Sequence, residues 1–187
     1  MSDIKQIPLN VMLPIFKLVH SASNDDYRPN LCGVNFDLLT GIGRATTGHY
    51  ASEVNLGEEY TKEYGTMGVI NIPKEACLYA LKIKAKEHYK TLVEIHDKEI
   101  KIIGNSATVS FDLLTDISFP NIEEVTPKGN PVFTIGFNPE YLVELLKSMR
   151  ENNKQTLAKL DFYGDHTTAI VVTVSGNKGL LMPMRVN

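Results

Sequence analysis

Cysteine is scarce in this sequence, and its scarcity argues against two classes of protein. Among 187 residues there are two cysteines, Cys32 and Cys77, with no CxxC pair and no histidine at a ligand spacing beside them. Disulfide frameworks need several cysteines, and zinc sites take them as closely spaced pairs. We therefore expect no metal site and no other cofactor, and a reducing compartment fits the composition.

Long hydrophobic runs are missing as well. The stretch VMLPIFKLVHSAS, residues 11–23, places an apolar run before small residues as a signal peptide does, but Pro14 and Lys17 interrupt it. A membrane-spanning helix needs about 20 apolar residues, and no segment approaches that length. We therefore expect a cytoplasmic protein with no membrane partner.

Positive charge is not in excess. The 19 lysines and arginines are outnumbered by 22 acidic residues, which gives a net charge of -3. A histone-like nucleic-acid binder, whose whole surface would be basic, is therefore not expected. The balance does leave room for one basic face opposite an acidic one.

Signatures of catalysis are absent too. The sequence contains no G-x-S-x-G, no Walker loop and no HExxH. Asp25 and Asp26 stand in a polar stretch, SASNDDYRP, that is typical of a loop. We therefore expect a protein that is not an enzyme. The histidines are scattered with no evident nucleophile and base: His20, His49, His88, His96 and His166.

Three similar stretches recur along the chain. They read IPLNVMLPIFKL from residue 7, IPKEACLYALKI from residue 72 and NPEYLVELLKSM from residue 138. Their prolines, Pro8, Pro73 and Pro139, are 65 and 66 residues apart. Proline suits the first turn of a helix because its missing N–H would have no partner there. The spacing therefore predicts three helices that begin at these prolines.

An apolar pattern of helical period follows each proline. In the third copy the residues at i, i+3, i+4 and i+7 are Leu142, Leu145, Leu146 and Met149, with Asn138 suited to the N-cap. The first copy keeps the same spacing, but Pro14 should bend or delay its helix.

Alternating runs rich in Val, Ile and Thr come after each helix, for example TLVEIHD, EIKIIG and ATVSFDL in the second copy. Such runs are typical of strands. A lead-in strand, a helix and three strands thus form one β-α-β-β-β unit, here called a module, and the chain holds three of them. The pattern predicts an α+β fold with curved antiparallel sheets and helices on one face. Chance spacing of three prolines is the alternative, and the matching strands after each one favour a true repeat.

Five segments resemble the bacterial sliding clamp family, the beta subunit of DNA polymerase III. They occur in the family's order and cover nearly the whole chain. The ending, Met-Pro-Met-Arg, adds to their specificity. The segments are DDYRPNLCGVNFD, RATTGHYASEV, FDLLTDISFPNIEEVTP, FTIGFNPEYLVELLKSM and LLMPMRV. The resemblance implies the DNA-clamp (processivity) fold.

The resemblance also predicts a shortened organisation. Residues 1–127 resemble the complete middle domain, with modules at about 1–66 and 67–127, and residues 131–187 resemble only the second half of the third domain. The family's first domain and half of its third are not matched. What is matched includes both surfaces that, in the family, flank the pocket for polymerase and clamp-loader peptides.

The resemblance predicts a peptide-binding pocket. Thr47 stands where the family motif has Asp, so Thr46 is an alternative match, and Tyr50 replaces the family's Arg, which changes the pocket's shape and partner preference. In an alternative interpretation, LLMPMRV is an edge strand whose alternate residues face the core. The resemblance favours the pocket. Its predicted residues are Arg28, Leu31, Thr46, Thr47, Gly48, His49, Tyr50, Pro127, Leu180, Met182, Pro183, Met184 and Arg185.

Duplex DNA is the second partner that the resemblance implies, through basic side chains on the helices. Lys82, Lys86 and Lys90 would share one stripe of the second helix if that helix runs so far. Lysines on exposed helix faces also serve solubility and suit a helix C-terminus, so both interpretations stay open. The predicted contacts are Lys17, Lys82, Lys86, Lys90, Lys147, Arg150 and Lys154.

Two functions are compatible with these features. The first is a compact processivity factor, of phage or mobile-element origin, that encircles or cradles DNA and tethers a polymerase. Family rings contain twelve modules, so four chains of three would close one, and the odd module's sheet edges invite a second chain. We therefore expect a homo-oligomer, a dimer or a tetramer. The second function is a clamp mimic that binds or sequesters clamp-binding proteins without holding DNA.

Overall fold

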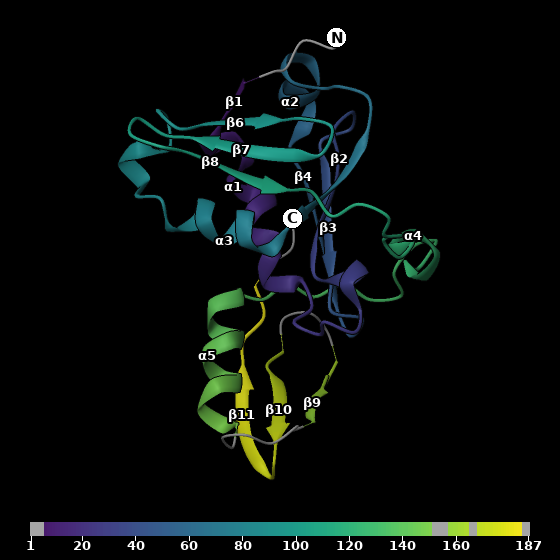
Figure 1. The fold of residues 1–187 in the computed structure, drawn as a ribbon. Coiled ribbons are helices and arrows are strands. Elements are labelled where there is room, and N and C mark those ends of the chain that lie inside the picture. The colour runs from purple at the N-terminus through teal and green to yellow at the C-terminus, as the bar shows by residue number, and fades with distance from the viewer. Residues whose placement is uncertain (1–5, 151–156, 165–167, 185–187) are drawn as a thin grey trace. The chain divides into compact units, whose positions relative to one another are not determined.

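The structure is a computed structural model that describes residues 6–150, 157–164 and 168–184 (Figure 1). The chain divides into two compact units, residues 1–126 and residues 127–187, called unit 1 and unit 2 below. None of the helices in the described ranges is long and apolar enough to cross a membrane.

Unit 1 contains two modules in succession, each a strand, a helix and three further strands. Short helices, α2 (Gly57–Glu63) and α4 (Ile122–Val125), follow them. The first module comprises β1 (Gln6–Pro8), α1 (Leu9–Lys17), β2 (Gly33–Asp37), β3 (Ile42–Thr46) and β4 (Ala51–Asn55). The second comprises β5 (Val69–Pro73), α3 (Lys74–Lys82), β6 (Leu92–Ile95), β7 (Glu99–Ile103) and β8 (Thr108–Asp112).

The two modules exchange their lead-in strands. The sheets are antiparallel, with strand orders β1-β6-β7-β8 and β4-β3-β2-β5. Ile7 of β1 lies opposite Val93 of β6, and Ile72 of β5 lies opposite Val34 of β2. Each four-stranded sheet is therefore complete only when the other module is present.

Helices α1 and α3 pack against each other and bury their apolar faces in one core with both sheets. Ile15 and Phe16 of α1 are fully buried, and α3 presents the small residues Ala76, Cys77 and Ala80 to the same core. Burial of a large aliphatic or aromatic side chain contributes about 1.5–3 kcal/mol. Burial also raises the pKa of the Cys77 thiol to about 12, so it remains neutral.

The helix starts follow the repeat closely, with two corrections. Pro8 and Pro73 occupy the N-cap position rather than the first turn, and Asn138 is the third N-cap, so the regular spacing is 65 residues, at positions 8, 73 and 138. Pro8 and Pro73 have φ of -57° and -66° with extended ψ, which lets a strand pass straight into a helix. Pro14 does not delay α1, which begins at Leu9 and runs through it.

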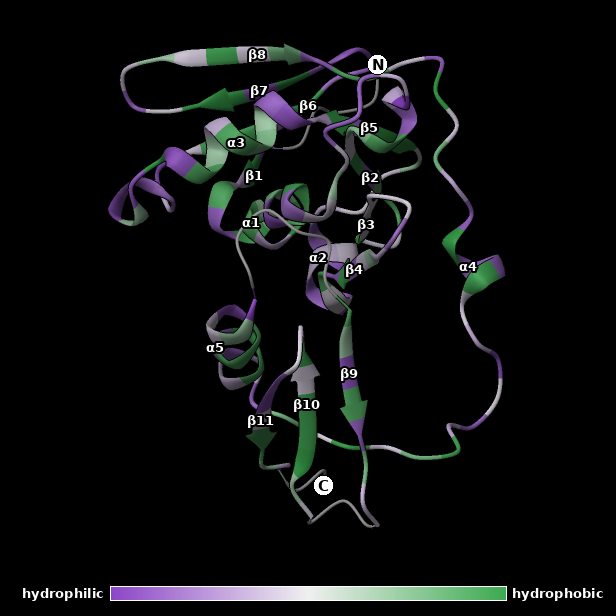
Figure 2. Ribbon diagram, turned by 90° about the horizontal axis from the view of Figure 1, so that it is seen from below, coloured by the Kyte–Doolittle hydropathy of each residue, from purple (hydrophilic) through white to green (hydrophobic). Residues whose placement is uncertain are grey.

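Unit 2 holds the third module. It consists of α5 (Pro139–Met149), β9 (Ala158–Asp161), β10 (Ile170–Val174) and β11 (Asn177–Leu181), with the sheet order β11-β10-β9. A single bridge joins Gly136, before α5, to Met184, after β11. Figure 2 shows green, hydrophobic residues along β10, the central strand of this sheet.

Two residues of unit 2 bear on how helix α5 begins and how it packs on the sheet. The side-chain oxygen of Asn138 accepts a hydrogen bond from the backbone N–H of Glu140 at 2.9 Å and so caps α5. Helix α5 packs closely on β11 at Gly179, where an added Cβ would lie 2.7 Å from Leu145 Cδ1. The predicted α+β fold is confirmed, and the third repeat shows its helix and three strands, with a single bridge where the other two have a lead-in strand.

Candidate functional site

Unit 1 brings together most of the predicted pocket residues that it contains. Residues 46–50 form the tight turn between β3 and β4. The hydroxyl of Thr46 accepts from the backbone N–H of Gly48 at 3.0 Å and donates to the carbonyl of Tyr50 at 2.7 Å. Gly48 has φ of +88°, and a Cβ there would lie 3.1 Å from Arg28 Nη1 and 3.8 Å from Leu31 Cδ1. Arg28 and Leu31 therefore lie against this turn.

Asp25 orients Arg28 beside the turn. Its carboxylate accepts from Arg28 Nε at 2.8 Å and from the backbone N–H of Tyr27 at 3.1 Å. The hydrogen bond from Arg28 holds the pKa of Asp25 below its ordinary value. The side chain of Arg28 stays about half exposed, so its charge is accessible from solvent. Leu31, in contrast, is buried. Sequence reasoning missed this role of Asp25, although its spacing of three residues from Arg28 was visible.

Two aromatic side chains add exposed surface near this turn. The hydroxyl of Tyr50 donates to the carbonyl of His20 at 3.2 Å, while more than half of Tyr50 remains exposed. Tyr27, which the sequence did not single out, is almost fully exposed and precedes Arg28.

Unit 2 contains the other predicted pocket residues. Leu181 is buried in the core of unit 2, whereas Leu180, Met182 and Met184 are 64%, 63% and 54% exposed. The alternation places the three exposed side chains away from that core. Pro183 is half-buried, Pro127 is exposed, and Arg185 lies outside the described residues. An exposed row of one leucine and two methionines is typical of an adaptable binding surface.

Three of the predicted DNA contacts are equivalent by position. Lys17, Lys82 and Lys147 each stand nine residues after their helix's N-cap residue, in the last turn, and all three are exposed. Lys147 also makes an exposed ion pair with Glu144 at 3.0 Å. The repeat thus places one cation at the same point of every module.

The expected lysine stripe on the second helix is wrong. Helix α3 ends at Lys82, because Ile83 is extended, with ψ of 134°. The carbonyl oxygen of Ile83 lies 2.8 Å from a ring nitrogen of His88, so its hydrogen-bond partner is a side chain. Lys86 falls in a short 3-10 turn and Lys90 beyond it, so neither continues the helical face of Lys82. Arg150 is the C-cap of α5, and Lys154 lies outside the described residues.

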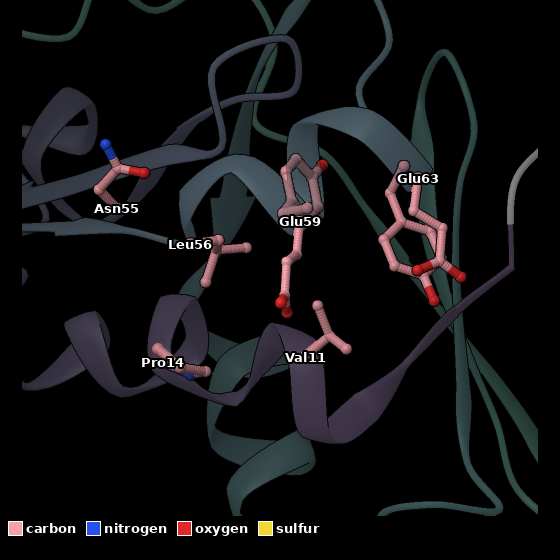
Figure 3. Close-up of a pocket in the computed structure, with 8 residues that line it drawn as sticks. Val11, Pro14, Asn55, Leu56, Glu59 and Glu63 are labelled. Carbon is pink, nitrogen blue, oxygen red and sulfur yellow. The ribbon is translucent and has the colours of Figure 1, made fainter.

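A cavity of about 310 Å³ lies between α1 and α2 in unit 1 (Figure 3). Glu59 and Glu63 of α2 stand one turn apart on its rim, and Glu59 points toward Val11 and Pro14 of α1. The Tyr60 ring is buried, and its hydroxyl has no hydrogen-bond partner among the described residues. Burial raises the pKa of Tyr60 to about 12, so this phenol stays neutral. No sequence pattern pointed to this cavity.

No group of side chains suited to a metal ion occurs within residues 6–150, 157–164 and 168–184. Unit 1 thus offers a guanidinium held by Asp25 beside the turn, and unit 2 offers a row of exposed apolar side chains.

Solved structures with the same architecture are bacterial replication proteins. The beta sliding clamp of C. crescentus superposes with a TM-score of 0.76 at 14% identity, over 97% of this chain and 50% of that one. The DNA polymerase beta subunit of Streptococcus pyogenes gives 0.77 at 15% identity, over 99% and 51%. The sliding clamp of Bacillus subtilis gives 0.73 at 16% identity, over 96% and 49%.

This chain has the sliding-clamp fold. The predicted DNA-clamp architecture is thereby confirmed, and the chain spans about half the length of the clamps that it matches. No protein-family model matches the sequence. No curated protein matches it either.

Proposed function

We propose that this protein acts as a sliding-clamp-like processivity factor for DNA replication. It would hold duplex DNA through the ends of its helices and tether polymerase or clamp-loader peptides through an apolar surface. The mechanism is topological and electrostatic, and no bond is made or broken. The observation that carries the proposal is the equivalent lysine at the end of α1, α3 and α5, set in a sliding-clamp fold.

The DNA part of the proposal rests on charge and position. Exposed lysines that recur once per module can neutralise phosphates at regular intervals without reading bases. The net charge of -3 gives the chain as a whole no attraction for DNA, so binding would depend on local groups of basic side chains. Affinity for DNA should therefore be modest, independent of sequence and strongly dependent on salt.

The peptide part of the proposal rests on exposed apolar side chains. Met182 and Met184 have flexible, polarisable side chains that fit peptides of varied sequence. Arg28, held by Asp25, offers a positioned guanidinium for a peptide carboxylate or carbonyl. We propose that the turn of residues 46–50 in unit 1 and the Leu180–Met184 row in unit 2 each contribute to peptide binding, as do Pro127 and Arg185.

A clamp mimic is the second candidate. A mimic would bind clamp-binding peptides and ignore DNA. The two candidates separate in one experiment, in which purified protein is incubated with closed circular and with linear duplex DNA, with and without a clamp loader. Retention on circles and loss from linear ends supports the processivity factor. Peptide binding without DNA retention supports the mimic, and binding of neither contradicts both.

A ring requires more than one chain, so we also propose a homo-oligomer. Sedimentation as a monomer at high protein concentration would exclude the ring. It would leave peptide binding by the mimic intact.

A further inference from the structure

Unit 1 shows how one module is completed by another. β1 of the first module pairs with β6 of the second, and β5 of the second pairs with β2 of the first. The exchange is reciprocal, so each module gives a lead-in strand and receives one. One module can therefore be completed by another module of the same kind.

Within the described residues, the module of unit 2 makes the contacts internal to one module but no strand pairing with a second module. In the part of the chain that the structure describes, β9 pairs with β10 alone, although β2 and β6 each have a second strand beside them. The lead-in segment of unit 2, residues 135–137, bonds to Met184 through Gly136. Its counterpart in β5, Asn71, has the same bond from Leu114 and pairs in addition with Asn35 of β2.

Helix α5 also exposes positions that are buried in α3. The fourth and seventh residues after the N-cap are Cys77 and Ala80 in α3, both fully buried, and Leu142 and Leu145 in α5, both partly exposed. The third residue is fully buried in α3, where it is Ala76. In α5 it is Tyr141, which is 65% exposed. In unit 1 this face is covered because α1 and α3 pack together.

We propose that the module of unit 2 is completed by the same module of a second copy of this chain, in a twofold-symmetric dimer. The lead-in segment of each copy pairs with β9 of the other, and the two α5 helices pack antiparallel. This interface goes beyond the proposed function, because it stands whether or not the protein binds DNA or peptides.

The β2–β5 pairing supplies the register. Val34 and Phe36 face the core of unit 1 opposite Ile72 and Ile70. Ala158 and Leu160 are the core-facing residues of β9. The same register places Phe137 of one copy opposite Ala158 of the other, and Ile135 opposite Leu160, so that two apolar pairs extend the core. Gly136 then lies opposite Lys159, as Asn71 lies opposite Asn35.

A further feature favours a second copy as the occupant. Charges along α5 are ordered, with Glu140 and Glu144 in its first half and Lys147 and Arg150 at its end. An antiparallel pair therefore sets acidic residues of one helix beside basic residues of the other.

The first test is sedimentation of the full chain and of two variants of α5. Tyr141→Arg places a charge in the proposed interface and should raise the dimer dissociation constant at least tenfold. Val143→Arg is the matched control, because its counterpart in α3, Leu78, is 36% exposed even in the completed domain. Circular dichroism confirms that both variants fold. A monomeric wild type, or equal effects of the two changes, overturns the proposal.

The second test does not depend on weakening the interface. Within one copy, Gly136 is bonded to Met184 beyond the β11 side of the sheet and Lys159 lies on β9, three inter-strand spacings or about 14 Å away. A disulfide between these positions should therefore form between copies. In a Cys32→Ser background, Gly136→Cys combined with Lys159→Cys should yield a covalent dimer on mild oxidation. Gly136→Cys combined with Lys178→Cys, on the opposite edge strand, should not.

Mixing the two single-cysteine variants refines this result. Gly136→Cys with Lys159→Cys should give a heterodimer linked by one disulfide, and each variant alone should give little covalent product. Equal yields from the Lys159→Cys and Lys178→Cys pairs, or no cross-link from either, would overturn the proposed register and interface.

Discussion

The backbone N–H of Met184 donates to the carbonyl oxygen of Gly136 at 2.8 Å, as Leu114 donates to Asn71 at 2.9 Å. Gly136 and Asn71 each stand two residues before the N-cap of their helix. The third module thus returns to its own lead-in segment in the same way as the second does. The backbone anchors the carboxy-terminal segment at this point, while the side chains of Met182 and Met184 remain exposed.

Removal of the three equivalent lysines should weaken DNA binding. In the Lys17→Ala, Lys82→Ala, Lys147→Ala triple variant, the slope of log affinity against log salt should fall by roughly 0.9 for each phosphate that is no longer neutralised. Fluorescence anisotropy with a labelled duplex at several salt concentrations measures this slope.

The matched control for this variant changes the same net charge elsewhere. Lys62, Lys98 and Lys178 are exposed lysines away from the ends of α1, α3 and α5. Their triple substitution by alanine should leave the slope close to that of the wild type. If both triple variants reduce the slope equally, the attraction is diffuse and the helix-end site is wrong.

Removal of the methionine side chains should weaken peptide binding without loss of stability. Met182→Ala combined with Met184→Ala removes two exposed apolar side chains that a bound peptide would cover. At about 25 cal/mol per Å² of apolar surface, the pair should cost roughly tenfold or more in affinity. Isothermal titration with a clamp-binding peptide measures the loss, and Met67→Ala, in an exposed loop of unit 1, is the control. An affinity equal to that of the wild type would contradict the pocket.

The sequence predicted helix starts better than helix ends or partners. A regular spacing marks residues 8, 73 and 138, because a strand that runs into a helix needs an extended residue there. Helix α3 ends at Lys82, before the extended Ile83, and no Gly or Pro in the sequence marks this end. Alternation of polar and apolar residues also specifies a strand's buried face but not its neighbour, so the exchange of β1 and β5 was not visible.

The candidate site also depends on contacts between distant segments of the chain. The turn at residues 46–50 was not predicted from the sequence, although Gly48 is of a residue type common in turns. The approach of Arg28 to Gly48 joins segments 20 residues apart and depends on how the intervening β2 and β3 pair.

Asp25 should make a small, pH-dependent contribution to stability. Its hydrogen bond from Arg28 lowers its pKa in the folded state below the ordinary 3.8. A lowered folded-state pKa contributes stability above the unfolded-state value, and this stability is lost as the pH falls through the folded-state value. Asp25→Asn should therefore melt slightly below the wild type at pH 6, and the two should converge as the pH falls well below 3.8.

Thermal melts of both proteins between pH of about 2.5 and pH of about 7 measure this difference. Asp26→Asn removes the neighbouring carboxylate and is the control. A constant difference between Asp25→Asn and the wild type over the whole range would show that the carboxylate charge makes no such contribution.

Loss of the Tyr60 hydroxyl should not destabilise the protein. The ring packs between Phe36 and Tyr64, with centroids 5.7 and 5.9 Å away, so Tyr60→Phe keeps the apolar contacts. The buried hydroxyl lacks a hydrogen-bond partner among the described residues, and burial of such a group costs about 1–3 kcal/mol. Tyr60→Phe should therefore leave the free energy of unfolding unchanged or raise it by about 1 kcal/mol. Tyr60→Ala, which empties the site, should lower it by about 3–5 kcal/mol. Urea denaturation measures both, and a loss above about 1 kcal/mol for Tyr60→Phe would mean that the hydroxyl has a partner in solution.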